Sequence, residues 1–301
     1  MRQYPSKLLL FGEHILLLGA RALAVPVPAF YGEWARRKPG EQPDAWADRL
    51  QEFAGSEPLK AVAGLDVSRF QADLQAGLFF KSTIPAGYGL GSSGALCAAV
   101  YDRYAGRKTA DLAELKFIFA GMESFFHGQS SGIDPLTSYL NRPLWIENRA
   151  EVRFFEPRPW FPAEPVIFLL DSRLPRRTGP LVQWFLEQSR EQVFLQRLEQ
   201  ELFPVHEAML DAWQNSDAAR FWPALARVSR FQLENMPPMI PDTVRAVWES
   251  CLGGSDVFLK ICGAGGGGFV LGFAVSKAAV NEKFRTFSPV FPFEHNGNAE
   301  K

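Results

Sequence analysis

The segment Pro85-Ala-Gly-Tyr-Gly-Leu-Gly-Ser-Ser-Gly-Ala95 joins a strand-like run at 77–84 to a helix-forming run at 92–104. Glycines let successive backbone N–H groups converge on one point, and the positive N-terminal end of the following helix faces the same point. Such a turn is suited to binding the phosphates of a nucleotide. A serine hydroxyl at the N-terminus of the helix is a suitable Mg²⁺ ligand. Taken alone, the segment is equally typical of a structural turn with Ser92 as the N-cap.

A second segment, Lys7-Leu-Leu-Leu-Phe-Gly-Glu-His14, places a lysine at the start of an apolar strand and two polar residues at its far end. Exposed charges on a strand and a turn explain such a pattern more often than function does, because most charged residues are solvated. The segment therefore indicates function only in combination with others.

The third segment runs from Glu123 to Asp134. Glu123 and His127 are four residues apart and so share one face of a helix, which Gly128 ends. A turn at 131–132 then lets Asp134 project back. One carboxylate for Mg²⁺ and a second beside a reacting hydroxyl are what phosphoryl transfer needs. When this segment is read in isolation, a structural role is favoured over a role in phosphoryl transfer. In that structural interpretation the segment is an amphipathic helix, and Asp134 caps the helix that follows.

A glycine run provides the fourth segment, because five of the six residues 263–268 are glycine. Glycine is costly in conformational entropy, and a hairpin needs only one or two. The run therefore indicates that something approaches this backbone closely, and a functional role is favoured over a purely structural one.

Composition narrows the class of protein. With 32 Lys and Arg against 33 Asp and Glu, the 301-residue chain has a formal charge of −1 and is 47% hydrophobic. This balance excludes disordered and collagen-like chains and argues against a general basic nucleic-acid binder. The few cysteines lie in apolar stretches, as expected for buried thiols in the cytoplasm, and no stretch predicts a membrane span. They are Cys97, Cys251 and Cys262.

Length and periodicity predict a mixed α+β chain of two domains. The Pro-rich stretch 157–165 is the predicted boundary between residues 1–160 and 161–301. Strands are expected at 7–11, 22–31, 77–84, 166–170, 256–261 and 269–275, with a hairpin at 143–147 and 152–156. Helices are expected at 44–53, 92–104, 111–128, 180–202, 205–214, 217–235 and 242–252.

In this order the segments resemble the motifs of the GHMP kinases, a family of small-molecule kinases. Lys7–His14 is similar to the first family motif, Pro85–Ala95 to the second and Cys262–Gly268 to the third. The mevalonate kinase branch is the most similar, through the first motif, the Glu123–Asp134 segment and the stretch Asp171–Thr178. The matches extend from residue 7 to about residue 272, which is nearly the whole chain.

The resemblance implies a two-domain GHMP kinase fold. An N-terminal domain like domain 2 of ribosomal protein S5 would precede a ferredoxin-like C-terminal domain, with ATP between them. Mg²⁺ would be held by Ser92 and Glu123. Asp134 would accept the proton of the substrate hydroxyl, and Lys7 would hold Asp134 ionised and stabilise developing charge. The ATP phosphates would be bound by Gly87, Gly89, Leu90, Gly91, Ser92, Ser93 and Gly94.

By resemblance alone, Glu13, His14 and Thr178 are assigned to the substrate, and the glycine loop consists of Gly263, Ala264, Gly265 and Gly266. A carboxylate substrate also needs a cation, and His14, Arg176 and Arg177 all remain open for that role. Two positions depart from the family pattern: Gly94 stands where alanine is usual, and Ser130 replaces a common proline.

The implied reaction is ATP- and Mg²⁺-dependent phosphorylation of the 5-hydroxyl of mevalonate to 5-phosphomevalonate, in isoprenoid biosynthesis. The expected binding partner is then a small-molecule substrate, and no binding to nucleic acid or to a membrane is expected. A homodimer remains an open alternative. One alternative is another kinase of the family, acting on phosphomevalonate, a sugar or homoserine. A basic cluster that includes Arg173, Arg176 and Arg177 keeps a phosphorylated acceptor open. A non-catalytic ATP-binding relative is the remaining alternative.

Overall fold

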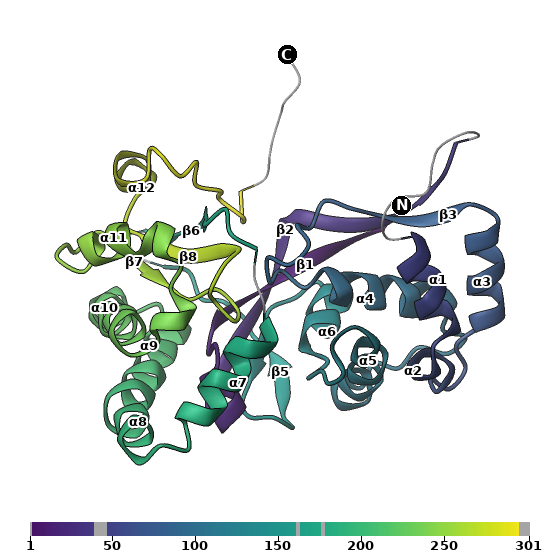
Figure 1. The fold of residues 1–301 in the computed structure, drawn as a ribbon, viewed down its shortest axis with the longest axis horizontal. Helices are drawn as coiled ribbons and strands as arrows, with labels where there is room; N and C mark the ends of the chain where they lie inside the picture. Colours follow the sequence, from purple (N-terminus) through teal and green to yellow (C-terminus); the bar gives the residue numbers. More distant parts are fainter. Residues whose placement is uncertain (1, 39–46, 161–162, 176–177, 295–301) are drawn as a thin grey trace.

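Two antiparallel sheets, one in each half of the sequence, organise the computed structural model, which describes residues 2–38, 47–160, 163–175 and 178–294 (Figure 1). The N-terminal sheet has the order β1-β2-β4-β5, with β3 also paired to β2. Because β2 is 15 residues long, β4 pairs with its start and β3 with its end. The strands are β1 (Gln3–Phe11), β2 (Ala22–Arg36), β3 (Leu78–Ser82), β4 (Leu144–Ile146) and β5 (Val152–Phe154).

The C-terminal sheet is smaller and has the order β6-β8-β7, again antiparallel throughout. Its strands are β6 (Val166–Asp171), β7 (Val257–Lys260) and β8 (Phe269–Ala274). The α+β class and the two-part organisation agree with the sequence prediction. The boundary at 157–165 stays a prediction, and residues 161–162 within it lie outside the described part of the chain.

Helices cover one face of the N-terminal sheet, where α4 and α6 contact β1 and β2 (Figure 1). Most residues of α4 are buried, because its run of serine, glycine and alanine lets neighbouring elements come close. Asp111 caps α5 by accepting a hydrogen bond from the backbone N–H of Glu114 at 2.8 Å. The helices of this half are α1 (Ala47–Gly55), α2 (Glu57–Lys60), α3 (Val67–Gln75), α4 (Ser92–Tyr104), α5 (Leu112–His127) and α6 (Ile133–Leu140), after a 3₁₀ turn at Ile15–Leu18.

The C-terminal half departs from prediction in its first helices. The helix predicted at 180–202 is divided into α7 and α8, and a π-helical turn at Leu198–Leu202 continues into α9. Pro204 at the start of α9 lacks an N–H group, which loosens the hydrogen-bond ladder at this point. The elements are α7 (Thr178–Gln188), α8 (Gln192–Arg197), α9 (Phe203–Asn215), α10 (Ala218–Asn235), a 3₁₀ turn at Pro237–Met239, α11 (Asp242–Cys251) and α12 (Lys277–Lys283).

Four helices were not expected from the sequence: α2, α3, α6 and α12. The omission of α6 matters most, because Asp134 lies inside its first turn and does not cap it. Gly132 is the N-cap, and Pro135 is tolerated because the first turn of a helix does not use its N–H groups.

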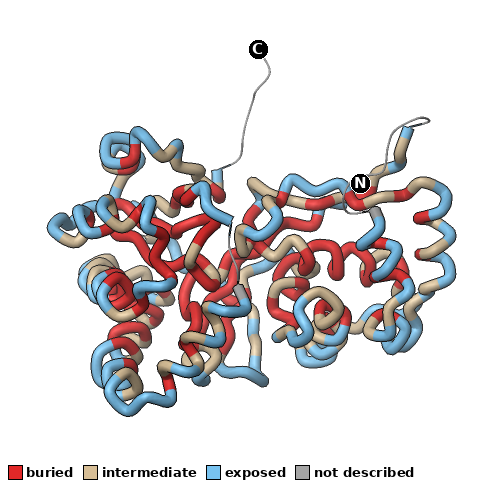
Figure 2. Tube along the Cα trace, viewed as in Figure 1, coloured by how far each residue is buried: buried red, intermediate tan, exposed pale blue. Residues whose placement is uncertain are grey.

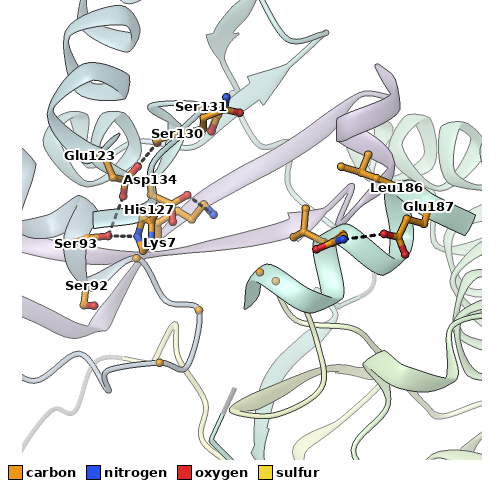
Figure 3. A pocket seen from close by; sticks show the side chains of 18 of the residues that line it. Lys7, Ser92, Ser93, Glu123, His127, Ser130, Ser131, Asp134, Leu186 and Glu187 are labelled. Atoms are coloured by element: carbon orange, nitrogen blue, oxygen red, sulfur yellow. Dashed lines mark hydrogen bonds and ion pairs between the residues drawn. The ribbon is translucent and has the colours of Figure 1, made fainter. Parts of the chain in front are cut away.

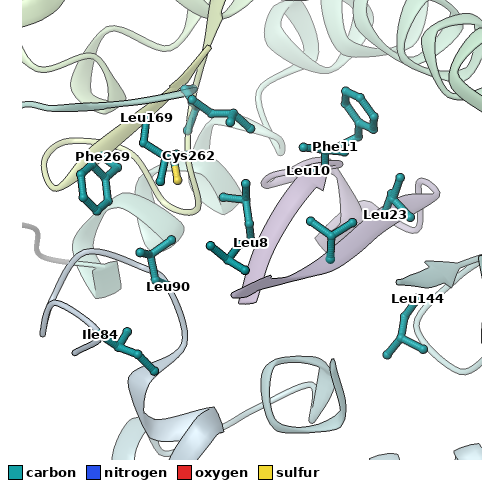
Figure 4. Packing of buried hydrophobic residues seen from close by; sticks show 14 of the residues in the cluster. Leu8, Leu10, Phe11, Leu23, Ile84, Leu90, Leu144, Leu169, Cys262 and Phe269 are labelled. Atoms are coloured by element: carbon teal, nitrogen blue, oxygen red, sulfur yellow. The ribbon is translucent and has the colours of Figure 1, made fainter. Parts of the chain in front are cut away.

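The hydrophobic core is continuous between the halves (Figures 2 and 4). The end of the β1–β2 hairpin reaches the C-terminal helices, where the Phe11 ring stacks on Phe273 with ring centres 5.5 Å apart. Arg21 forms ion pairs with Glu207 and Asp211 of α9. None of the described helices is both long and apolar enough to cross a bilayer.

Candidate active site

A cavity of about 790 Å³ lies where the glycine-rich loop after β3, the start of α4, the α5–α6 connection and α7 meet (Figure 3). It brings together residues from all three motif regions of the N-terminal half. The lining comprises Lys7, Gly87, Gly89, Gly91, Ser92, Ser93, Glu123, His127, Gln129, Ser130, Ser131, Asp134, Gly179, Val182, Gln183, Leu186, Glu187, Arg190 and Gly263.

Lys7 and Asp134 form the closest charged contact in this cavity. Nζ of Lys7 lies 2.5 Å from Oδ1 of Asp134 (Figure 3). The backbone N–H of Lys7 donates to the carbonyl oxygen of Leu90 at 2.9 Å, so β1 is tied directly to the glycine-rich loop. The sequence motifs that were expected to share a site therefore meet at Asp134.

Glu123 is buried on α5 and is held by two hydroxyl groups. Ser93 donates to its Oε1 at 3.0 Å, and Ser130 donates to its Oε2 at 2.5 Å. The Ser93 hydroxyl also lies 3.0 Å from Nε2 of His127. Burial, and then the negative charge of Asp134, raise the pKa of Glu123 to about 7, against the lowering effect of these hydrogen bonds. The site therefore favours a cation beside the two carboxylates.

The donor set fits Mg²⁺, which is typically held by one or two carboxylates together with substrate phosphates. Among the described residues, no group of three or more His, Cys, Asp or Glu side chains is arranged to hold a metal without such help. The sequence assigns the hydroxyl ligand to Ser92, but the hydroxyl that contacts Glu123 is that of Ser93. Successive residues at a helix start point about 100° apart, so only one of the two faces Glu123.

The glycine-rich loop turns as its glycines predict. Gly87, Gly89 and Gly91 all have positive φ, of +77°, +77° and +71°, which residues with a side chain rarely adopt. These glycines, with Ser92 and Ser93, line the cavity. Two other residues expected to bind phosphates do not line it: the Leu90 side chain is buried in the core, and Gly94 lies inside α4.

Glu13 and His14, which the resemblance assigns to the substrate, are not among the residues that line the cavity. The Glu13 carboxylate accepts hydrogen bonds from Nζ of Lys260 at 2.6 and 2.5 Å, and both side chains are 1% exposed. Burial raises the pKa of Glu13, while Lys260 opposes that change. Nε2 of His14 lies 3.1 Å from the carbonyl oxygen of Ala264. These contacts join the end of the first motif to β7 and to the third motif.

The second glycine run has neighbours on almost every side. Of Gly263, Ala264, Gly265 and Gly266, only Gly263 lines the cavity. Something does approach the other glycines closely, but it is this chain itself. A Cβ at Gly265 would lie 2.6 Å from the carbonyl oxygen of Met239, and one at Gly268 would lie 2.9 Å from Cα of Tyr88. Packing therefore accounts for most of this run.

The α7 wall of the cavity was not expected from the sequence, although a helix was predicted there. Val182 and Leu186 on α7 and Arg190 in the turn after it are spaced four residues apart, and this helical period was the only available signal for this face. Leu186 and Glu187 lie across from Lys7 and Asp134 in Figure 3. Thr178 begins α7. Arg176 and Arg177 lie outside the described residues.

We expect Glu123 to make the magnesium-free protein less stable as pH rises. Its folded-state pKa of about 7 exceeds the ordinary 4.5, so the folded protein holds this proton more tightly than the unfolded chain. The free energy of unfolding therefore falls between about pH 4.5 and pH 7. Glu123→Gln should melt several degrees above wild type at pH 8 in EDTA, and close to wild type at pH 4.5, by scanning fluorimetry.

The matched control is Glu114→Gln, an exposed carboxyl at the start of the same helix. It should leave the pH dependence unchanged. Mg²⁺ with ATP should raise the melting temperature of wild type at pH 8 more than that of Glu123→Gln. Equal stabilisation of the two proteins would remove Glu123 from the metal site.

Residues 57–142 match the family model described as the GHMP kinases N terminal domain. The L. major mevalonate kinase in complex with R-mevalonate has the same fold, with 17% identity and a TM-score of 0.67 over 98% of this chain and 97% of that one. The Streptococcus pneumoniae phosphomevalonate kinase, in complex with phosphomevalonate and AMPPNP, has 14% identity and a TM-score of 0.63 over 94% of each chain.

The Lactococcus lactis galactokinase complexed with galactose has 14% identity and a TM-score of 0.64, over 94% of this chain and 87% of that one. No functionally curated protein matches the sequence. Proteins with this fold have thus been solved in complex with different small molecules, namely R-mevalonate, phosphomevalonate and galactose.

Proposed function

We propose that this chain, which carries the N-terminal domain of the GHMP kinases and has their fold, transfers the γ-phosphoryl group of ATP to the 5-hydroxyl of mevalonate. The observation that carries the proposal is the contact between Lys7 and Asp134, 2.5 Å long, in a cavity that Glu123 also lines. Phosphoryl transfer depends on positioning and charge stabilisation, and these three groups supply both.

In the proposed reaction, Asp134 accepts the hydroxyl proton as the acceptor oxygen attacks the γ-phosphorus. The new oxygen–phosphorus bond forms as the bond from the γ-phosphorus to the bridging oxygen breaks, and ADP leaves with that electron pair. Lys7 balances the negative charge on Asp134 and on the transferred group. The residual exposure of Asp134 leaves room for the acceptor hydroxyl.

The phosphates would lie against the N–H groups of the glycine-rich loop and the first turn of α4. Glu123 and the Ser93 hydroxyl would hold Mg²⁺, which when bound would neutralise negative charge on the ATP phosphates. Ser130, at 2.5 Å from Glu123, fixes the direction of that carboxylate.

The nucleotide base would extend away from Asp134. A second, apolar cavity of about 110 Å³ adjoins the first at Ser92. It is lined by Leu50, Phe79, Phe80, Ser82, Ile84, Ser92 and Leu96. An apolar slot beside the phosphate site suits the flat face of a purine.

Two observations support an acidic acceptor. The sequence resembles the mevalonate kinase branch most closely, and Arg190, in the turn that follows α7, lines the cavity. No ion pair joins Arg190 to another residue of the described ranges, whereas Lys7 is already in contact with Asp134. Arg190 is thus available for a carboxylate.

A panel of acceptors tests the proposal. Purified protein with ATP and Mg²⁺ should release ADP when R-mevalonate is added, measured in a coupled assay. Phosphomevalonate, galactose and homoserine serve as controls and should give rates at least about a hundredfold lower. Turnover on one of these and none on mevalonate would assign the chain to that acceptor. ATP binding without turnover on any acceptor would favour a non-catalytic relative.

A further inference from the structure

Gly94 lies near the start of α4 and packs against the backbone of α6. A Cβ added at Gly94 would lie 2.8 Å from the carbonyl carbon of Asp134, 2.8 Å from the nitrogen of Pro135 and 2.9 Å from Cβ of Asp134. Two of these atoms belong to the backbone, so no change of rotamer relieves the contact. An alanine at position 94 requires α4 or α6 to move.

A second glycine contact holds the same turn of α6. Gly132, the N-cap of α6, has a φ of +72°. A Cβ at this position would lie 2.2 Å from the carbonyl oxygen of Lys116 and 2.8 Å from the nitrogen of Ala120, both on α5. The first turn of α6 thus meets α4 and α5 through bare backbone, and close packing leaves it little freedom to shift.

We propose that Gly94 is a positioning residue for phosphoryl transfer, because its bare Cα sets how closely Asp134 approaches Lys7 and the glycine-rich loop. The inference rests on the proposed function. It follows from the geometry: a Cβ at Gly94 would press on Asp134 and on the adjoining nitrogen of Pro135, and Oδ1 of Asp134 lies 2.5 Å from Nζ of Lys7. Asp134 lies in the first turn of α6, so a displacement of this helix by a few tenths of an ångström would directly change the distance between Asp134 and Lys7.

Helix stability gives no reason for Gly94, because glycine is less favourable than alanine within a helix. Gly121 of α5 provides the contrast, because no atom lies within 4 Å of the place where its Cβ would stand. Both glycines are helical, and only Gly94 has neighbours that exclude a methyl group.

The test compares Gly94→Ala with Gly121→Ala. We expect Gly94→Ala to lower kcat at least about tenfold, because small misplacements of reacting groups are costly, while its Kd for ATP stays within about twofold of wild type. Gly121→Ala should keep wild-type kcat. An Asp134→Asn background provides the decisive readout: there, Gly94→Ala should cause no further loss of rate, because its effect acts through Asp134.

A second measurement needs no turnover. Lys7→Met and Asp134→Asn, made singly and together, give the coupling of these two side chains in the midpoint of urea unfolding. We expect this coupling to shrink by at least half when alanine replaces Gly94. If wild type turns over no acceptor, the proposed function fails while this measurement still decides the inference.

Four results would overturn the inference. The first is an unchanged kcat in Gly94→Ala, and the second is an equal fractional loss of rate in the Asp134→Asn background. The third is a Gly94→Ala protein that does not fold although Gly121→Ala does, because the contact then serves the fold as a whole. An undiminished coupling of Lys7 with Asp134 would count equally against it.

Discussion

Asp134→Asn is expected to lower kcat by about a hundredfold or more while ATP still binds. The carboxylate is the proposed acceptor of the hydroxyl proton, and an amide of the same size cannot take that proton. Lys7 would keep its place beside the amide oxygen of the variant, so the cavity should retain its shape. Steady-state rates with mevalonate and calorimetric titration with an ATP analogue measure the two quantities separately.

The matched control is Asp242→Asn in the first turn of α11, where the side chain is 98% exposed. It removes the same charge from the protein outside the cavity and should leave kcat unchanged. Wild-type turnover in Asp134→Asn would remove Asp134 from the mechanism. Loss of ATP binding together with turnover would instead indicate that Asp134 shapes the nucleotide site.

Breaking the Glu13–Lys260 pair is expected to produce the largest change in stability. Glu13→Gln leaves the Lys260 ammonium buried without its partner carboxylate, and such a break costs about 3–5 kcal/mol in the free energy of unfolding. The double variant Glu13→Leu/Lys260→Met should recover much of that loss, because it removes both charges. Urea unfolding at pH 7 measures both effects.

An exposed ion pair calibrates this result. Lys60 and Glu57 lie 2.8 Å apart with side chains 49% and 86% exposed, so Lys60→Met should cost less than about 1 kcal/mol. If Glu13 binds substrate, as the sequence resemblance implies, Glu13→Gln would instead raise the KM for the acceptor and leave stability near wild type. The two roles therefore predict different measurements.

The parts of the site that could be predicted are those encoded in local sequence. The glycine-rich loop, the helix start at Ser92 and the i, i+4 pair of Glu123 and His127 follow from rules that span a few residues. The resemblance to a family then placed Lys7 and Asp134 beside them, and their 2.5 Å contact agrees with that expectation.

The parts that were missed depend on contacts between distant segments. Glu13 and Lys260 are 247 residues apart, and no local pattern indicates that they neutralise each other. The second glycine run has the composition of a ligand-binding loop, yet Met239 and Tyr88 occupy the space beside it. The glycine content indicated that other atoms approach this backbone closely. Only the tertiary fold could show that those atoms belong to Met239 and Tyr88 of the same chain.

The hairpin of β1 and β2 has a consequence for how such a chain can be divided. Its tip lies in the core of the C-terminal half, where Phe11 packs on Phe273 and Arg21 pairs with α9. A fragment cut at the Pro-rich stretch would expose Phe11 in one piece and leave an unfilled hollow around Phe273 in the other. Neither half is therefore expected to fold well when it is exchanged into another protein without its partner half. Recombination between genes is expected to keep the two halves together.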